Sequence, residues 1–92
     1  MTILYMDVES VQNTRTRMAA AQQNLREDIS MLTINVQRII GSAWIGASAE
    51  GFYEEYDQIR IQLLQNLDAL EQLSKTLQNE MAQWQEAAAR FG

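Results

Sequence analysis

Residues 41–52 read Gly-Ser-Ala-Trp-Ile-Gly-Ala-Ser-Ala-Glu-Gly-Phe, and they hold three of the four glycines in a chain of 92 residues without proline. Glycine is costly inside a helix, but it is favoured where the backbone needs a positive φ or another chain approaches closely. The three glycines bracket Trp44, so this stretch is where the chain turns most easily. We therefore predict two long helices that fold back on each other at Trp44, Ile45 and Gly46.

The segment before the turn repeats apolar residues in steps of three and four, the spacing of one face of a helix. The positions of this series are Val8, Val11, Arg15, Met18, Gln22, Leu25, Ile29, Leu32, Val36 and Ile39. Asp7 is placed to cap the N-terminus of this helix, and Gly41 is placed to end it. The pattern predicts a helix over about residues 8–40.

The segment after the turn repeats in the same way. Its positions are Phe52, Tyr56, Ile59, Leu63, Asn66, Leu70, Leu73, Leu77, Glu80, Trp84, Ala87 and Phe91. With Ser48 as the N-cap, the second helix is predicted over about residues 48–90, and the alternative is that Ala47 is already helical. The fold class is therefore all-α, and residues 1–92 form a single domain that is an antiparallel two-helix hairpin.

Paired antiparallel about the turn, the two series meet along the whole first helix, with Leu32 near Ile59 and Met18 near Leu73. The same register brings Gln22 near Asn66 and Arg15 near Glu80, where each polar side chain can find a partner. The alternative for Arg15 and Glu80 is that their long side chains reach out to water.

A second set of apolar residues lies beside these two series, where a hairpin alone leaves it uncovered. Its members are Met31, Ile34, Tyr53, Leu64, Leu67 and Met81. Scattered exposed apolar side chains are common, but a run along so much of one helix indicates contact with another protein. We predict that this set is a dimer interface and that two hairpins form a four-helix bundle. A homodimer is favoured because neither face concentrates one sign of charge, and a heterodimer with a similar hairpin stays open.

The residue inventory excludes most chemistry. The chain has no cysteine and no histidine, so thiolate and imidazole metal sites and the Ser-His and Cys-His nucleophiles are absent. Glu50, Glu54, Glu55 and Asp57 lie on one stretch of helix, where their carboxylates diverge rather than converge on a cation. A net charge of -5 opposes binding to nucleic acid or to anionic membrane surfaces. We predict a protein that is not an enzyme, holds no metal or cofactor and does not insert stably into a membrane.

The residues around the turn resemble the signature of the WXG family, the early-secreted-antigen-like proteins of type VII (ESX) secretion. That signature is a Trp-x-Gly turn followed by small residues and then an aromatic residue, and Trp44, Gly46, Ser48, Ala49 and Phe52 fill these places. The resemblance implies a hairpin that dimerises head to tail and leaves the cytoplasm folded, through a membrane ATPase complex. The motif also has a structural reason, since Trp44 can close the end of the helix pair over Ala49 and Phe52, with Gly46 leaving room for the reversal.

The chain departs from the family pattern near its C-terminus. Family members often carry a Tyr-x-x-x-Asp/Glu export motif after the second helix, and here no tyrosine follows Tyr56. Tyr53 and Asp57 satisfy the spacing but stand at the start of the second helix, where acidic residues also suit the helix dipole. They are a candidate export motif beside the alternative of a solvated acidic turn.

Three functions are compatible with the sequence. The favoured one is a secreted component of the type VII system that acts through dimerisation. The second is a targeting chaperone or adaptor that pairs with the helical N-terminus of a larger secreted toxin. The third is an intracellular helical scaffold in which the Trp-x-Gly match is coincidental.

Overall fold

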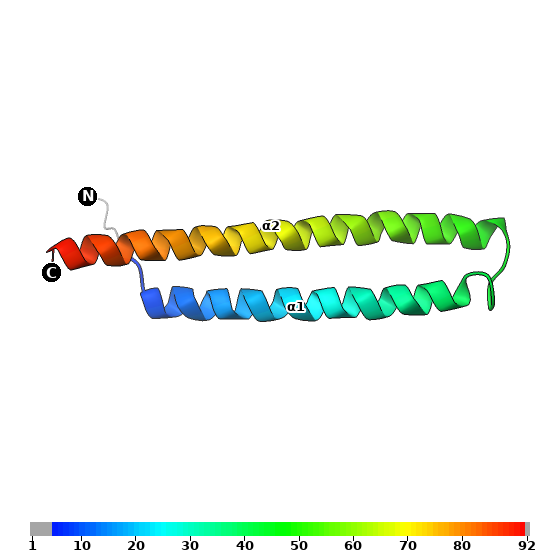
Figure 1. Cartoon of the computed structure of the whole chain (residues 1–92), viewed down its shortest axis with the longest axis horizontal. Helices are drawn as coiled ribbons and strands as arrows, with labels where there is room; N and C mark the ends of the chain where they lie inside the picture. Colours follow the sequence, from blue (N-terminus) through cyan, green and yellow to red (C-terminus); the bar gives the residue numbers. More distant parts are fainter. Residues whose placement is uncertain (1–4, 92) are drawn as a thin grey trace.

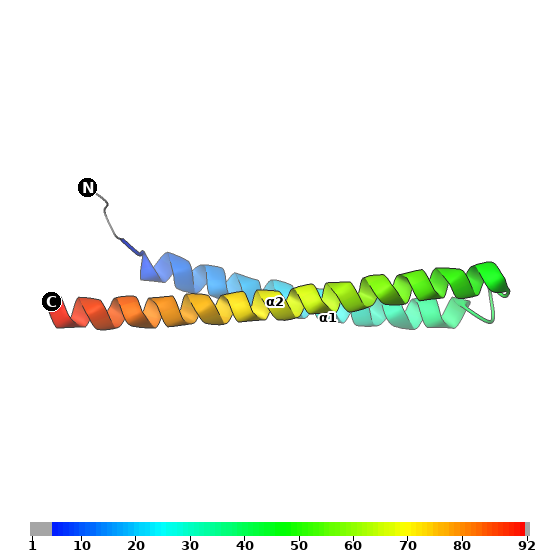
Figure 2. The ribbon, with the colours of Figure 1, turned by 90° about the horizontal axis from the view of Figure 1, so that it is seen from above.

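The computed structural model describes residues 5–91 and confirms the predicted helical hairpin. Helix α1 spans Val8–Ile39 and helix α2 spans Ala47–Phe91. The two helices lie side by side and antiparallel (Figure 1), and seen from above they cross at a shallow angle (Figure 2). The hairpin measures 68 × 22 × 18 Å, so it is a single elongated layer.

The ends of the helices are set by local hydrogen bonds. Asp7 caps α1 as predicted: its carboxylate accepts from the Ser10 backbone N–H at 3.2 Å and from the Ser10 hydroxyl at 2.8 Å. These bonds favour the charged carboxylate and lower the pKa of Asp7. Helix α2 begins one residue before Ser48, and the Glu50 N–H donates to the Gly46 carbonyl at 3.2 Å. Ser48 is therefore not the N-cap, and the alternative that Ala47 is already helical is confirmed.

Hydrogen bonds between the helices follow the predicted antiparallel register. Arg15 Nε donates to the Ser74 carbonyl at 3.2 Å, and Thr33 and Tyr56 join their hydroxyls at 2.7 Å. Arg15 also reaches Gln78 Oε1 at 3.3 Å, so the pairing of Arg15 with Glu80 was wrong. The second predicted polar pair is absent too, since no hydrogen bond joins Gln22 to Asn66 among the described residues.

The face that each helix turns toward the other agrees in part with the predicted face. In α1 seven of the ten predicted positions are buried or partly buried: Val8, Val11, Arg15, Met18, Gln22, Ile29 and Val36. In α2 the predicted Tyr56, Leu70, Leu77 and Trp84 are partly buried.

At other positions the contact lies one residue further along the helix. In α1 the predicted Leu25, Leu32 and Ile39 are exposed, and the residues that follow them are partly buried: Arg26, Thr33 and Ile40. In α2 the predicted Phe52, Ile59, Leu63 and Leu73 are exposed, and again the next residues are partly buried: Tyr53, Arg60, Leu64 and Ser74. Because the confirmed and the shifted positions alternate along each helix, the contact face is rotated toward one edge of the apolar arc by less than the rotation of about 100° that one full residue gives.

The consequence is a small core. The buried apolar residues of the described chain are Val36, Ala49, Leu67 and Met81. Many large apolar side chains stay exposed, because a single layer of two helices covers only one side of each helix. The hairpin therefore has apolar surface left for a second layer.

Candidate protein-interaction surface

The turn between the helices is built on two glycines with positive φ. Gly41 has a φ of 87° and Gly46 a φ of 125°, a region that L side chains rarely adopt. Between them the Trp44 N–H donates to the Ile39 carbonyl at 2.8 Å, and the Gly41 N–H donates to the Trp44 carbonyl at 2.9 Å. The backbone of Trp44 is thus tied to the end of α1.

The structure brings the motif residues of the turn together. The rings of Trp44 and Phe52 lie with centroids 5.3 Å apart and planes inclined by 45°. Ala49 is only 1% exposed, which explains why a small residue stands there. The indole itself is 37% exposed, so the hairpin covers one side of Trp44 and leaves the other side open.

One flank of the hairpin is apolar. We call the apolar flank the exposed residues Leu25, Leu32 and Ile39 of α1 with Phe52, Ile59, Leu63 and Leu73 of α2. At its centre is a groove of about 400 Å³ lined by Leu25, Asp28, Ile29, Leu32, Leu63, Asn66, Leu67 and Leu70. Asp28 is the one charged residue in that lining. This groove has the composition of a surface that another helical protein covers.

The predicted interface residues do not share one face. Leu67 and Met81, at 6% and 8% exposed, are buried, and Tyr53 and Leu64 are partly buried, so placing these four outside the contact between the helices was wrong. The other two are exposed, Met31 at 64% and Ile34 at 46%, and neither lines the groove of the apolar flank. The reason is the displacement of the contact face toward one edge of the apolar arc: some residues assigned to the contact between the helices are exposed, and the residues that follow them are buried or partly buried.

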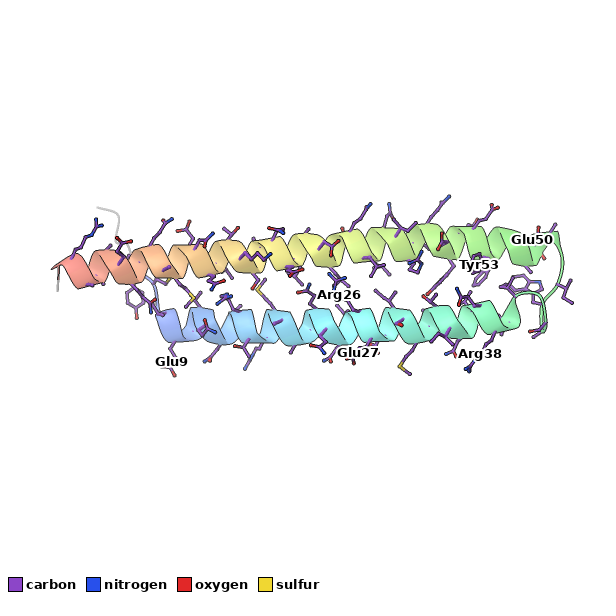
Figure 3. The ribbon with its side chains drawn as sticks, viewed as in Figure 1. Glu9, Arg26, Glu27, Arg38, Glu50 and Tyr53 are labelled. Carbon is purple, nitrogen blue, oxygen red and sulfur yellow. The ribbon has the colours of Figure 1, made fainter. Side chains whose placement is uncertain are left out.

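The opposite flank of the hairpin is polar. Arg26 donates to Asp68 across the helices at 2.7 Å, and Figure 3 shows Arg26 between the two helices. Arg26 and Arg60 line a hollow whose other residues are Ile29, Ser30, Thr33, Ile34 and Leu64. We call this side, with Arg15, Arg26, Asp57, Arg60, Asp68 and Gln78, the polar flank. Its ion pairs and amides are arranged for contact with water.

Tyr53 and Asp57, the candidate export motif, both have partners within the hairpin. The Tyr53 hydroxyl accepts from Gln37 Nε2 at 3.4 Å. Asp57 Oδ1 accepts from Arg60 Nη2 at 2.7 Å, and this bond raises the pKa of the Arg60 guanidinium. The two side chains therefore lie one helical turn apart and take part in intramolecular hydrogen bonds.

The described residues offer no cluster of three acidic or other ligating side chains that could hold a metal ion. Over the same residues, neither helix contains a window long and apolar enough to cross a membrane.

The sequence contained a signal for this flank. The apolar residues Leu25, Leu32 and Ile39 recur every seven positions, and the residues that follow them are the more polar Arg26 and Thr33, then Ile40. An apolar arc wide enough for two neighbours is typical of helices in bundles. The periodicity of the sequence predicted this arc, but we expected the residues in its middle to contact the other helix of the same hairpin.

Comparison with family models identifies the chain. Residues 4–87 match the WXG100 model, described as proteins of 100 residues with WXG. The chain belongs to the WXG100 family. This is the WXG-motif, early-secreted-antigen-like family of type VII secretion substrates, whose members are non-enzymatic helical proteins. No curated protein and no solved structure matches the chain in the corresponding comparisons.

The turn geometry shows what the motif of the WXG100 family does in this chain. The motif residues Trp44 and Gly46 are those whose backbone closes the hairpin, and the match covers nearly all of both helices. The family thus accounts for the fold and the motif, while the apolar flank is a property of this chain's own residues.

Proposed function

We propose that this WXG100 protein is a type VII secretion substrate that acts as a folded homodimer, in which two hairpins stack their apolar flanks into a four-helix bundle. The observation that carries the proposal is the apolar flank, with its leucine-lined groove of about 400 Å³ open at the surface of a one-layer fold. When a second copy covers the groove, each Å² of apolar surface removed from water stabilises the dimer by about 25 cal/mol. The assembled bundle, rather than any reaction, is what the secretion machinery recognises.

Partner choice follows from charge. The groove lining contains a single carboxylate, Asp28, and no basic side chain. Two copies that dock through this groove therefore repel each other little, and the groove has no positive charge that would favour an acidic partner instead. The export ATPase complex of the type VII system is the proposed second partner. Tyr53 and Asp57 remain a prediction as an export motif.

Light scattering on the chain as it elutes from a size-exclusion column tests the dimer. A helical species of about 21 kDa, twice the 10.5 kDa chain, is the expected result. A monomer that becomes fully helical only with a different WXG protein would replace the homodimer by a heterodimer. A stable complex with the helical N-terminus of a larger toxin, outcompeting the homodimer, would favour the adaptor function.

Export is tested in a host with an active type VII system. We expect the chain in the culture medium, and we expect its loss from the medium when the ATPase of the system is inactivated. Retention in the cytoplasm in both strains would contradict the proposal, while a cytosolic marker protein controls for lysis.

A further inference from the structure

The outer face of α2, which points away from α1, carries a row of uncharged side chains that are mostly carboxamides. Figure 3 shows side chains along this face, and every residue of the row is exposed. We call the row the carboxamide stripe, and its positions follow one another in steps of four and three: Gln58, Gln62, Gln65, Ala69, Gln72, Thr76, Asn79 and Gln83. These steps keep the stripe on one face of the helix over about 38 Å.

The carboxamide stripe is unusual because it holds no charged residue. Charged residues make up 21% of the chain, and the outer face of a surface helix normally carries them. The outer face of α1 follows that rule, with Arg17 and Arg38 exposed on it. On α2 the nearest charges of the same face are Glu55 and Glu86, each three residues beyond an end of the stripe. Charge is therefore absent from this face in particular.

Carboxamides are self-complementary, because each offers N–H donors and a carbonyl acceptor to another carboxamide. Within residues 5–91 the carboxamides of the stripe have no hydrogen-bond partner in the hairpin, whereas Gln12, Gln37 and Gln78 of the inner faces each have one. Two copies of a chain with a net charge of -5 repel each other, and an uncharged face is where they approach at the lowest cost. The stripe thus has the chemistry of a contact between two copies.

The steps of the stripe read the same in both directions, so two stripes can pair antiparallel about a two-fold axis. The residues that come level are Gln58 with Gln83, Gln62 with Asn79, Gln65 with Thr76, and Ala69 with Gln72. The small side chain of Ala69 leaves room there for the longer Gln72. A parallel pair sets Ala69 on Ala69, which leaves a gap, and Glu55 on Glu55, which brings like charges together. In the antiparallel pair Glu55 meets Glu86, whose charge is balanced by Arg90 at 2.7 Å.

A hollow at one end of the stripe can receive a side chain of the second copy. It has a volume of about 560 Å³ and is lined by Glu55, Gln58, Ile59, Ile61 and Gln62. Four of these residues, from Glu55 to Gln62, stand at positions i, i+3, i+4 and i+7, the arrangement that forms a hole for one side chain of a facing helix. The antiparallel pairing brings Gln83 of the second copy level with this hollow. Ile59 and Ile61, at 56% and 43% exposed, add apolar area at its edges.

We infer that the carboxamide stripe is a second interface, through which a further copy of this protein docks with its α2 antiparallel. The contact uses a face that the proposed homodimer leaves open, and a single hairpin can form it as well. Each homodimer carries two stripes, one on each copy, so repeated contacts join dimers into longer assemblies. A stripe of about 38 Å on a helix about 10 Å wide covers only about 380 Å² per copy, below the size of a stable interface. The contact is therefore weak and forms at high protein concentration.

Sedimentation velocity over a series of protein concentrations measures this contact. From about 10 μM to about 1 mM we expect the average sedimentation coefficient to rise beyond that of the homodimer. Gln65→Glu combined with Gln72→Glu keeps the side-chain size and brings carboxylates of the two copies to within about 6 Å along the helix, so we expect the association constant between dimers to fall by about tenfold or more. Asn24→Asp combined with Asn35→Asp is the matched control, since it adds the same charge on the exposed outer face of α1 and is expected to leave the association unchanged.

Charge reversal and cross-linking test whether the two stripes touch and in which direction. Gln65→Lys combined with Gln72→Lys is expected to lose self-association but to bind the double glutamate variant. The chain has no cysteine of its own, so oxidation of a mixture of Gln58→Cys and Gln83→Cys is expected to join copies of the two variants. Gln58→Cys alone is expected to stay unlinked, because its two copies stand about 38 Å apart in the antiparallel pair.

Three results would overturn the inference. A sedimentation coefficient that does not change up to about 1 mM would remove the second interface and leave the homodimer standing. Equal losses in the glutamate variant and its aspartate control would mean that net charge, and not this face, governs the association. Cross-linking of Gln58→Cys alone would contradict the antiparallel direction. Leu32→Lys keeps the two interfaces apart, since it is expected to separate the homodimer and to leave single hairpins that still pair through the stripe.

Discussion

On one side of the hairpin the gap between α1 and α2 is bridged by charged and amide side chains, and on the other side it is a groove lined mainly by leucines. The Arg26–Asp68 ion pair crosses the polar flank at 2.7 Å, with side-chain exposures of 35% and 69%. The groove on the apolar flank holds Leu25, Leu32 and Leu63 around the same stretch of the helices. One side of the hairpin is therefore suited to contact with water and the other to contact with protein. This difference predicts which substitutions weaken the dimer and which have little effect.

The largest effect is expected from a charge on the apolar flank. Leu32→Lys places an ammonium group in the groove that the second copy covers and buries it without a partner, so we expect the dimer to weaken by about a thousandfold or more. Ile34→Lys is the matched control, since Ile34 is similarly exposed but lies on the polar flank. The dissociation constants from analytical ultracentrifugation check the pair, and a dimer split by Ile34→Lys but not by Leu32→Lys would reverse the assignment of the flanks.

The next largest effect separates the core of the hairpin from its exposed surface. Leu67 is 6% exposed, so Leu67→Ala removes buried contacts and is expected to lower the free energy of unfolding by about 3 kcal/mol. Met31→Ala, at a position that is 64% exposed and outside the apolar flank, is expected to cost less than half as much. Urea unfolding at one fixed protein concentration measures both, because the stability of a dimer depends on concentration. Equal losses would mean that a second copy covers Met31, which would contradict docking through the apolar flank.

A smaller effect concerns the polar contact inside the hairpin. Thr33 Oγ1 lies 2.7 Å from the Ile29 carbonyl and 2.7 Å from the Tyr56 hydroxyl. Thr33 has one proton and donates it to the carbonyl, so Tyr56 donates to Thr33. Tyr56→Phe is expected to cost about 1 kcal/mol of unfolding free energy. Tyr53→Phe, which loses an exposed bond of 3.4 Å, is expected to change little, and thermal unfolding compares the two.

These expectations show which features the sequence could predict. The turn was predictable because the chain has no proline and its clustered glycines include two with positive φ, Gly41 and Gly46. The register was predictable because helices of this length that meet at a fixed turn have one way to align. Both depend on local backbone properties and on distance along the chain, which a single sequence contains.

The face of contact was not predictable in the same way. The periodicity of the sequence shows where the middle of an apolar arc lies, at residues such as Leu32 and Ile59. It does not show which helix, of the same chain or of another protein, contacts each edge of the arc. In the hairpin the edge at Thr33 and Arg60 faces the other helix, and the middle stays exposed. An apolar arc whose middle points out of the hairpin is typical of a bundle helix that contacts two other helices, one in its own hairpin and one in a second layer.

The smallest effect is expected on the polar flank. Asp68→Asn removes the ion pair with Arg26, but both side chains are partly solvated and exchange the pair for water at little cost. We expect a change in unfolding free energy of about 0.5 kcal/mol, reduced further at high salt, and an unchanged dimer. Urea unfolding at low and high salt, with ultracentrifugation of the same variant, measures both quantities. A loss of dimer in Asp68→Asn would mean that the polar flank also contacts the second copy, and the contrast between the two flanks would then have to be abandoned.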